Sequence, residues 1–277
     1  MTLNQRIQHF YDRSTQLWLD VWGEHMHHGY YGADGTERKE HRQAQIDLIE
    51  ELLTWGNVDS AGRILDVGCG VGGSARYLAR KFDAEVLGLT LSEVQAECAA
   101  AYNQQANLQD QVKIRAQDMM TLTEADGRFD LIWSLESAEH IADKRGLLEL
   151  FYKMLKPGGK FLMVTWCHRD VPPALNDKEK SVINNICELY HLPPMISPGD
   201  YEQIVQDLGF QHVETADWSE AVRPFWGAVI QSALSWRSLR GLIRSGWSTV
   251  RGAYAMRYMQ QGFREEIIKY AVFQGQK

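Results

Sequence analysis

The sequence predicts an α/β fold in which helices cover both faces of a mainly parallel sheet. Short apolar runs of strand length alternate with helical segments between residues 63 and 165, which is typical of parallel strands joined by right-handed crossovers. Two further strand-like runs, residues 210–216 and 267–273, are separated by a long and mostly helical segment. We therefore expect one antiparallel strand, an N-terminal helical lid ahead of the sheet and a C-terminal helical insertion.

Length and charge bound the domain organisation and the class of partner. The chain has 277 residues, of which 44% are hydrophobic, and this composition suits a globular protein with a sizeable core. Its net charge of −7 argues against nucleic acid as a partner. We expect a single domain over residues 1–277, made of a lid (1–36), a core with the sheet (37–220), a helical cap (221–264) and a last strand (265–277).

The cysteines and the N-terminus bear on the cellular compartment. The four cysteines are scattered, without the spacing of disulfides or of metal ligands. The first residues hold no apolar signal core, and the chain has no apolar run of 18 residues. These features predict a cytoplasmic protein without a bound metal, with at most a peripheral contact to a membrane.

The first helix is expected around residues 7–21, where apolar and aromatic residues recur at helical spacing. Residues 22–32 follow, with three histidines and three aromatic residues next to glycines. They contain no helical pair of histidines four residues apart and no carboxylates at ligand spacing, which disfavours a metal site. We expect this loop to close over a bound ligand, and a second helix to cover residues 38–55.

Residues 63–80 predict a buried strand, a glycine turn and the start of a helix. Glycine permits positive φ and lets a ligand lie against bare main chain, while the helix start offers unpaired N–H groups. Residues 68–73 also match the G-x-G-x-x-G fingerprint of dinucleotide-binding sheets. That site needs an acidic residue at the end of the second strand, where this chain has Thr90. An NAD-dependent dehydrogenase is therefore the less favoured alternative. The distinctive residue is Asp66, which lies inside the first strand, two residues before the first glycine of the turn.

The alternation continues with strands expected at residues 85–89, 112–115, 129–133 and 161–165, and helices at residues 92–106 and 143–155. Ligands of such sheets bind at the carboxyl ends of the strands. After the second strand, Thr90, Ser92 and Gln95 can hydrogen-bond a ribose without charge, although Ser92 is equally suited to cap the next helix.

The third and fourth strands also end in polar residues. Asp118 and Met119 offer a carboxylate acceptor for an exocyclic amine and a soft side chain for a purine face. Glu136 and His140 follow the fourth strand and are expected to face the reacting centre.

These motifs resemble those of S-adenosylmethionine-dependent methyltransferases, and among them the tocopherol methyltransferases of photosynthetic organisms. The likeness rests on residues 20–32, 65–72, 133–140, 155–159, 165–169 and 216–219. It implies a Rossmann-like class I methyltransferase sheet and S-adenosylmethionine as cofactor. It also implies methyl transfer to a lipophilic aromatic small molecule, in the founding members at a ring carbon of a tocopherol- or quinol-like phenol. Plant members carry a chloroplast transit peptide, whereas this sequence starts at the first helix, which suggests a bacterial or mature form.

Similar sequences act on indole alkaloid amines in secondary metabolism, so an N-methyltransferase remains the alternative. A phenol acceptor is a better nucleophile once its proton is removed, and a nearby base can take that proton. The candidates are His140 first and His27 second, with His28 and Glu136 behind them. An amine acceptor needs only its neutral lone pair.

The expected site residues fall into two further groups. The cofactor is expected to contact Tyr11, Asp66, Gly68, Cys69, Gly70, Thr90, Leu91, Gln95, Asp118, Met119 and Leu135. The acceptor is expected to contact Trp22, His28, Tyr31, Trp166, Phe225 and Trp226.

The cap segment is unusually basic. Residues 221–264 hold seven arginines and no Asp, Glu or Lys, so the rest of the chain has a net charge of −14, which is −7 minus +7. Arg237, Arg240, Arg244 and Arg251 follow helical spacing beside apolar residues. One interpretation is a helix that rests on an anionic membrane and collects a lipophilic acceptor. The other is a solvated charged rim on the lid of a pocket. The oligomeric state is left open.

Overall fold

The computed structural model describes residues 1–227 and 247–277, and within them seven strands form one sheet in the order β3-β2-β1-β4-β5-β7-β6. Strands β1 to β5 are parallel to one another, and β7 runs antiparallel between β5 and β6. The strands are β1 (Arg63–Val67), β2 (Glu85–Thr90), β3 (Val112–Ala116), β4 (Phe129–Leu135), β5 (Leu155–His168), β6 (Gln211–Asp217) and β7 (Ile268–Gln276). This arrangement confirms the predicted fold class.

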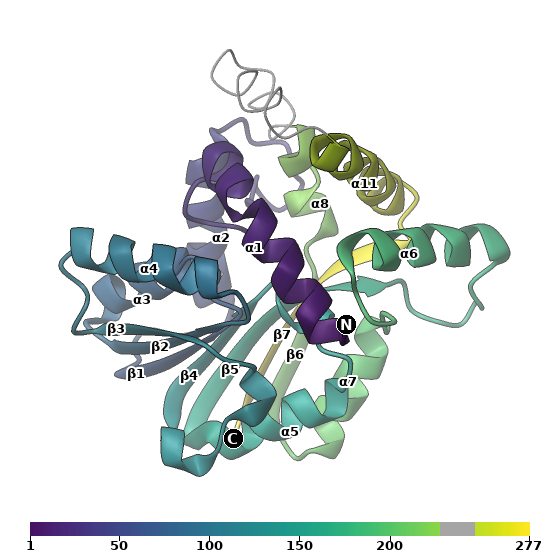
Figure 1. Cartoon of the computed structure of the whole chain (residues 1–277). Helices are drawn as coiled ribbons and strands as arrows, with labels where there is room; N and C mark the ends of the chain where they lie inside the picture. Colours follow the sequence, from purple (N-terminus) through teal and green to yellow (C-terminus); the bar gives the residue numbers. More distant parts are fainter. Residues whose placement is uncertain (228–246) are drawn as a thin grey trace.

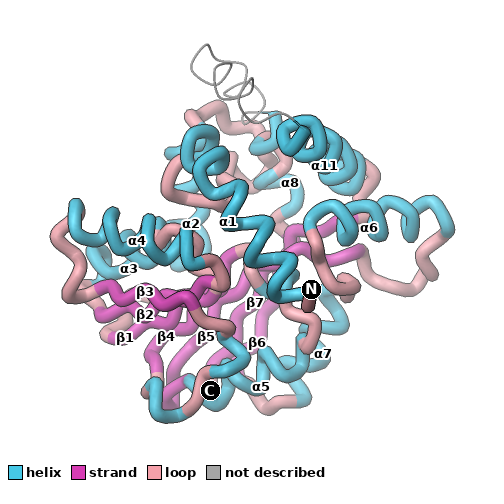
Figure 2. The backbone as a smooth tube through the Cα atoms, in the orientation of Figure 1, coloured by secondary structure: helices cyan, strands magenta, loops and turns pink. Residues whose placement is uncertain are grey.

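Helices lie on both sides of the sheet (Figures 1 and 2). One apolar cluster joins α2 and α3 to one face, and a second joins α5 and α7 to the other. The described helices of at least four residues are α1 (Leu3–Trp22), α2 (His41–Trp55), α3 (Gly73–Phe82), α4 (Glu93–Gln105), α5 (Lys144–Met154), α6 (Asp177–Tyr190), α7 (Pro198–Asp207), α8 (Ser219–Val222) and α11 (Trp247–Arg264). Three single turns of 3-10 helix are η1 (Met119–Thr121), η2 (Glu124–Asp126) and η3 (Ala138–His140).

Strand β1 is buried on both of its faces. Ile64 packs in the first apolar cluster and Leu65 in the second, and neither side chain is exposed. Central parallel strands read as continuous apolar runs for this reason, since helices cover both sides of the sheet. The order in which strands are added to the sheet reverses between β1 and β4, because β2 and β3 lie on one side of β1 and the later strands on the other. A crevice therefore opens at the carboxyl ends of these two strands, which is where such sheets bind ligands.

Two elements differ from the sequence-based expectation. Helix α7 was not expected, although Ser197 caps it, Asp200 completes a capping box and Pro198 occupies its first turn, which is a recognisable start signal. Strand β5 begins at Leu155, directly after α5. The predicted turn at residues 155–160 is thus an irregular start of β5, with a register shift opposite Phe129.

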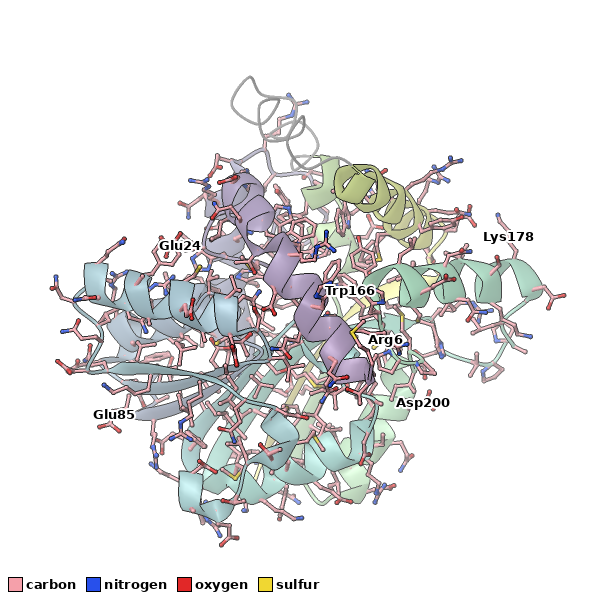
Figure 3. All side chains as sticks on the ribbon, viewed as in Figure 1. Arg6, Glu24, Glu85, Trp166, Lys178 and Asp200 are labelled. Carbon is pink, nitrogen blue, oxygen red and sulfur yellow. The ribbon has the colours of Figure 1, made fainter. Side chains whose placement is uncertain are left out.

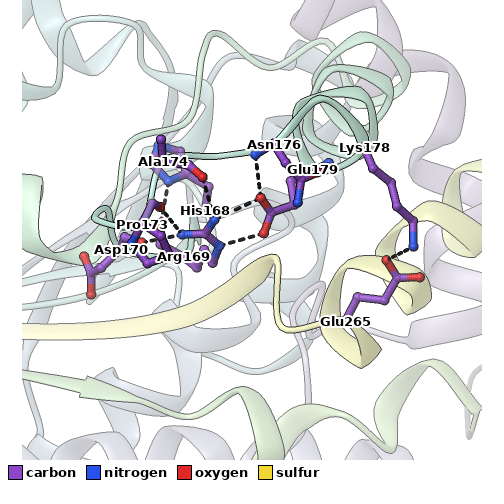
Figure 4. Close-up of polar contacts among 9 residues, drawn as sticks. All are labelled: His168, Arg169, Asp170, Pro173, Ala174, Asn176, Lys178, Glu179 and Glu265. Carbon is purple, nitrogen blue, oxygen red and sulfur yellow. Dashed lines mark hydrogen bonds and ion pairs between the residues drawn. The ribbon is translucent and has the colours of Figure 1, made fainter.

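The loop after β5 is held in place by Arg169 (Figure 4). Its guanidinium donates to both carboxylate oxygens of Glu179 at 2.7 and 2.9 Å, and to the carbonyl oxygens of Asp170, Pro173 and Ala174. This fork geometry suits arginine and not lysine. The contacts fix the start of α6, which packs along α11 at the same end of the sheet.

The cap is described only in part. Arg237, Arg240 and Arg244 lie outside the described residues, as does the side chain of Arg251. Among the residues that the structure describes, no helix is long and apolar enough to cross a membrane.

Candidate active site

The turn between β1 and α3 is built for close approach of the main chain. Gly68 and Gly70 have φ values of +72° and +53°, in the region that glycine adopts without strain. A Cβ atom at Gly68 would lie 2.2 Å from the Cβ of Ser137, whose hydroxyl donates to the carbonyl of Val67 at 2.6 Å. A Cβ at Gly70 would meet only the Met26 sulfur, at 3.7 Å. The turn is thus locked to the end of β4 on one side and open on the other.

A cavity of about 560 Å³ lies on the open side of this turn. It is bordered by the carboxyl ends of four parallel strands and by one side of α1. Its lining residues are Thr2, Leu3, Asn4, Ile7, Tyr11, Met26, Val67, Gly68, Gly70, Leu89, Thr90, Leu91, Gln95, Gln117, Asp118, Met119, Met120, Leu135, Glu136, Ser137, His140, Ile141, Ala142 and Asp143. The cavity offers bare main chain at a glycine turn, polar strand ends and methionine side chains. A nucleoside with a charged amino-acid tail needs such partners, so the residues present fit S-adenosylmethionine.

Nine of the predicted cofactor residues border the cavity: Tyr11, Gly68, Gly70, Thr90, Leu91, Gln95, Asp118, Met119 and Leu135. Asp66 and Cys69 do not, and Asp66 is buried inside β1. Burial raises the pKa of Asp66 to about 7, and one of its carboxyl oxygens has no hydrogen-bond partner among the described residues. Cys69 belongs to the turn, with its amide bonded to Leu89 of β2.

The residues predicted to hold a ribose form a small network of their own. The Thr90 hydroxyl donates to the side-chain oxygen of Gln95 at 2.7 Å. Ser92 caps α4, as one of its two interpretations predicted, by accepting from the Gln95 amide at 3.1 Å. Its own hydroxyl donates to Asp12 of α1 at 2.5 Å.

Helix α1 forms the roof of the cavity and crosses in front of the sheet in Figure 1. Besides the Asp12 contact, the Asn4 amide donates to Asp118 at 2.6 Å, and the Tyr11 hydroxyl lies 2.9 Å from Nε2 of His140. Three side chains of one helix thus reach the ends of β2, β3 and β4. The cavity is covered while these contacts hold.

His140 is half-buried beside the cavity as a neutral imidazole. Burial, helped by the nearby charge of Lys144, lowers its pKa to about 3. Burial also raises the pKa of Tyr11, with the carboxylates of Glu139 and Glu136 adding to the effect. The tyrosine therefore stays a phenol, and its hydroxyl shares a hydrogen bond with Nε2. His140 is a weak base in this setting.

Glu136 also borders the cavity and is bound to two other segments. It accepts from the amide and from Nδ1 of His28 at 2.6 and 2.8 Å, and from the Tyr270 hydroxyl at 2.6 Å. His27, next to His28, is buried too, with Nδ1 2.8 Å from the His28 carbonyl, and burial lowers its pKa. Among the described residues, no group of three or more metal-ligating side chains is present.

Five of the six predicted acceptor residues form one aromatic cluster. The ring of His28 lies 4.8 Å from Phe225, 5.0 Å from Trp226 and 6.0 Å from Trp166, and Trp22 lies 5.1 Å from Phe225. Trp166, which comes from β5, is labelled in Figure 3. In this cluster the ring nitrogens of Trp22, Trp166 and Trp226 and Nε2 of His28 are buried without a hydrogen-bond partner among the described residues. Unpaired buried polar groups of this number are rare and call for an explanation.

Tyr31 does not share a ring contact with this cluster within the described part of the chain. Its amide is bonded to Ala221, and burial together with Glu40 raises the pKa of its phenol to about 12. The loop of residues 22–32 was expected to close over the ligand, yet only Met26 of it borders the cavity. The histidine-rich part instead packs against α2, where Gln45 donates to the carbonyl of His27 at 2.9 Å.

The sequence did not predict several residues that line the cavity or the aromatic cluster. Thr2, Leu3, Asn4 and Ile7 lie on one side of α1 and could have been found only by knowing that this helix folds over the strand ends. Tyr270 and Phe263 lie near the chain end, more than 230 residues from His28 in sequence and no local pattern connects them.

The chain was compared with known proteins. The family model described as Mycolic acid cyclopropane synthetase matches residues 2–218. The chain is 44% identical to a "Probable tocopherol O-methyltransferase, chloroplastic" of Oryza sativa subsp. japonica, over 98% of this chain and 77% of the relative. It is 39% identical to the "Tocopherol O-methyltransferase, chloroplastic" of Arabidopsis thaliana, over 99% and 82%.

A third relative is the "2-methyl-6-phytyl-1,4-hydroquinone methyltransferase" of a Synechocystis strain, 31% identical over 96% of this chain and 86% of the relative. Among solved structures, the cyclopropane synthase MmaA2 from Mycobacterium tuberculosis superposes with a TM-score of 0.85 at 18% identity, over 99% and 98% of the two chains. At that identity the likeness shows the shared fold.

Proposed function

We propose, from the premise that the chain belongs to the tocopherol methyltransferase-like family of S-adenosylmethionine-dependent methyltransferases, that it methylates a ring carbon of a tocopherol- or quinol-like phenol. The observation that carries the acceptor class is the 44% identity with a probable tocopherol O-methyltransferase over 98% of the chain, and the ring carbon is the part of the proposal that product analysis must decide. The enzyme is a methyltransferase with S-adenosylmethionine as its cofactor, and its acceptor is a small molecule.

The proposed cofactor site is the cavity under α1. Gly68 and Gly70 would leave room for the methionine portion, Thr90 and Gln95 would hydrogen-bond the ribose, and Asp118 would accept from the adenine amine. S-adenosylmethionine supplies an electrophilic methyl group. The contribution of the chain is to hold the acceptor atom in line with it and to exclude water, and such alignment can be worth roughly 7–11 kcal/mol.

The proposed acceptor site is the aromatic cluster behind Glu136. A flat phenolic ring suits a wall of Trp and Phe side chains, and a hydroxyl can pair with ring nitrogens that otherwise stay unsatisfied. Trp22, His28, Trp166, Phe225 and Trp226 are the proposed contacts, and their unpaired nitrogens support this assignment. Because Glu136 borders the cavity and is bonded to His28, the two sites adjoin each other.

The function is tested by incubating the purified protein with radiolabelled S-adenosylmethionine and one acceptor at a time. The panel holds a chromanol with a free ring position, a prenylated hydroquinone and an indole alkaloid amine. We expect label in the chromanol or hydroquinone, and NMR of the product should place the new methyl on a ring carbon. Label on the phenolic oxygen would correct the methylated atom, and transfer to the amine alone would contradict the proposed acceptor class.

We also propose that residues 221–264 contact an anionic membrane surface, since this segment has a charge of +7 beside many apolar residues and the proposed acceptor is lipophilic. Cosedimentation with vesicles should increase as phosphatidylserine replaces phosphatidylcholine, and should decrease when salt is added. Binding that depends neither on lipid charge nor on salt would contradict this proposal and favour a solvated charged rim on the lid of the pocket.

A further inference from the structure

Glu136 holds an unusual backbone conformation at the end of β4. Its φ is +54°, a value that strains a residue with a side chain and persists where the surroundings enforce it. Here the surroundings are three hydrogen bonds to one carboxylate, two from His28 and one from Tyr270. These bonds tie the N-terminal loop and β7 to the strand end that borders the cofactor cavity.

The charge of this carboxylate fixes the proton on His28. Burial opposes ionisation of Glu136, but the His28 side chain and the hydrogen bonds outweigh it and hold the pKa of Glu136 below its usual 4.5. An ionised carboxylate only accepts hydrogen bonds, so Nδ1 of His28 carries a proton, and in the neutral form of the imidazole this is its only N–H. Nε2 then carries a free lone pair.

This lone pair lies inside the aromatic cluster. His28 is fully buried, and Nε2 has no hydrogen-bond partner among the described residues. Its ring is surrounded by Phe225, Trp226, Trp166, Phe263 and Tyr270 at centroid distances of 4.8 to 6.0 Å. A buried acceptor nitrogen with aromatic rings about it is a place for the hydroxyl of a flat phenolic ring.

We propose that His28, oriented by Glu136, is the base that takes the hydroxyl proton of the acceptor through Nε2. The inference rests on the proposed function. The O–H bond breaks with its electron pair left on oxygen, and an N–H bond forms at Nε2, giving an imidazolium that Glu136 neutralises. The acceptor ring then uses its own electron pair to bind the methyl group, while the pair of the broken sulfur–carbon bond remains on sulfur. Loss of the ring proton and return of the proton from His28 to oxygen restore the phenol, so one proton is released per methyl transferred.

The other histidines offer less for this role. Nε2 of His140 is already taken by the Tyr11 hydroxyl, and its surroundings disfavour a positive charge. His27 also has an unpartnered Nε2, but its Nδ1 faces the carbonyl of His28 and no carboxylate orients it. The titratable groups that face His28 are Glu136 and Tyr270, with His27 beside it in the chain.

The kinetic test compares His28→Asn with wild type on phenols of decreasing pKa. An Asn amide can still donate to Glu136 in place of Nδ1–H, but it has no nitrogen in place of Nε2. We expect turnover of an ordinary phenol, with a pKa near 10, to fall by about 10²–10⁴-fold. The loss should shrink for more acidic phenols and at higher pH, because these acceptors ionise without help. Glu136→Gln should show a smaller loss with the same dependence on phenol pKa.

Two comparisons separate a base from a structural residue. His41→Asn removes another buried histidine with an unpartnered Nε2, at the start of α2 and outside the aromatic cluster, and should leave turnover unchanged. A loss in His28→Asn that is equal for all phenols, or below threefold, would overturn the assignment. If His28→Asn does not fold, the phenol dependence of Glu136→Gln decides alone.

A second readout needs no turnover. In protein with ¹⁵N-labelled histidine, the signals that disappear in His28→Asn should show a proton on Nδ1 and none on Nε2, and a bound phenol should shift the Nε2 signal. A proton on Nε2 in the free protein, or no shift with a phenol that binds, would overturn the proposal. If wild type methylates the amine and no phenol, the proposed function fails, whereas the tautomer of His28 is still tested by these spectra.

Discussion

Gly70→Val is expected to weaken S-adenosylmethionine binding by about 10- to 100-fold, the equivalent of roughly 1–3 kcal/mol of overpacking. In the free protein a Cβ at this position meets only the Met26 sulfur, at 3.7 Å, so the added side chain has room in the empty cavity. That room is the space proposed for the cofactor. The substitution therefore acts on the ligand more than on the neighbouring side chains.

The control for this prediction is Gly209→Val. Gly209 also has positive φ, +84°, and a Cβ there meets nothing within 4 Å. It lies between α7 and β6, away from the cavity. Both variants should lose similar stability from backbone strain, about 1–2 kcal/mol, which thermal melting measures. Calorimetry should show the loss of cofactor affinity in Gly70→Val alone. Unchanged affinity in both variants would show that the cofactor does not bind on this side of the turn.

The free energy of unfolding of the free enzyme is expected to fall as pH rises from about 6.5 to 8 because of two buried carboxyls. Below that range His25 and His140 oppose the decline, since burial lowers their pKa values from 6.5 to about 3. Burial raises the pKa of Asp66 from 3.8 to about 7, and burial together with the charge of Glu136 raises that of Glu139 from 4.5 to about 8. Between the two pKa values of each group, the native state keeps a proton that the unfolded chain releases, so stability declines with pH. A shift of about 3 units corresponds to roughly 4 kcal/mol for each group at the upper end of the range.

Urea unfolding at several pH values measures this decline. Asp66→Asn should remove the part below about pH 7, and Glu139→Gln the part that extends to about pH 8, since an amide does not titrate. Asp59→Asn, on the exposed surface between α2 and β1, should leave the slope unchanged. Equal slopes in wild type and in both buried variants would show that these carboxyls ionise as freely in the native state as in the unfolded one.

The sequence was most informative where structure is set by neighbours in the chain. The strand, turn and helix at residues 63–82 follow from apolar runs and glycines, and the structure has them as β1, the turn and α3. Eight of the nine cofactor residues that border the cavity were placed for the same reason, since each lies at or after the end of a strand that had to face the crevice, whereas Tyr11 lies on α1. Helix α7 was missed although its capping signal was present.

The remaining parts depend on contacts between distant segments. Glu136 meets His28 across 108 residues and Tyr270 across 134, and no periodicity in the sequence reports such a meeting. The base ranked first on sequence, His140, was chosen for its position after β4. Its pKa and its bond to Tyr11 depend on burial under α1, which only the folded chain reveals.

The two chain termini lie near opposite ends of the strands of the sheet. Helix α1 begins at Leu3 in the roof of the cavity, whereas β7 ends at Gln276 beside the amino-terminal start of β5, where Lys277 pairs with Gly158 and Gly159 (Figure 1). A reporter or affinity tag fused ahead of Thr2 would hang from the roof and interfere with the exchange of spent cofactor. The same tag fused after Lys277 would leave the roof free, so immobilisation for binding measurements should use the carboxyl terminus.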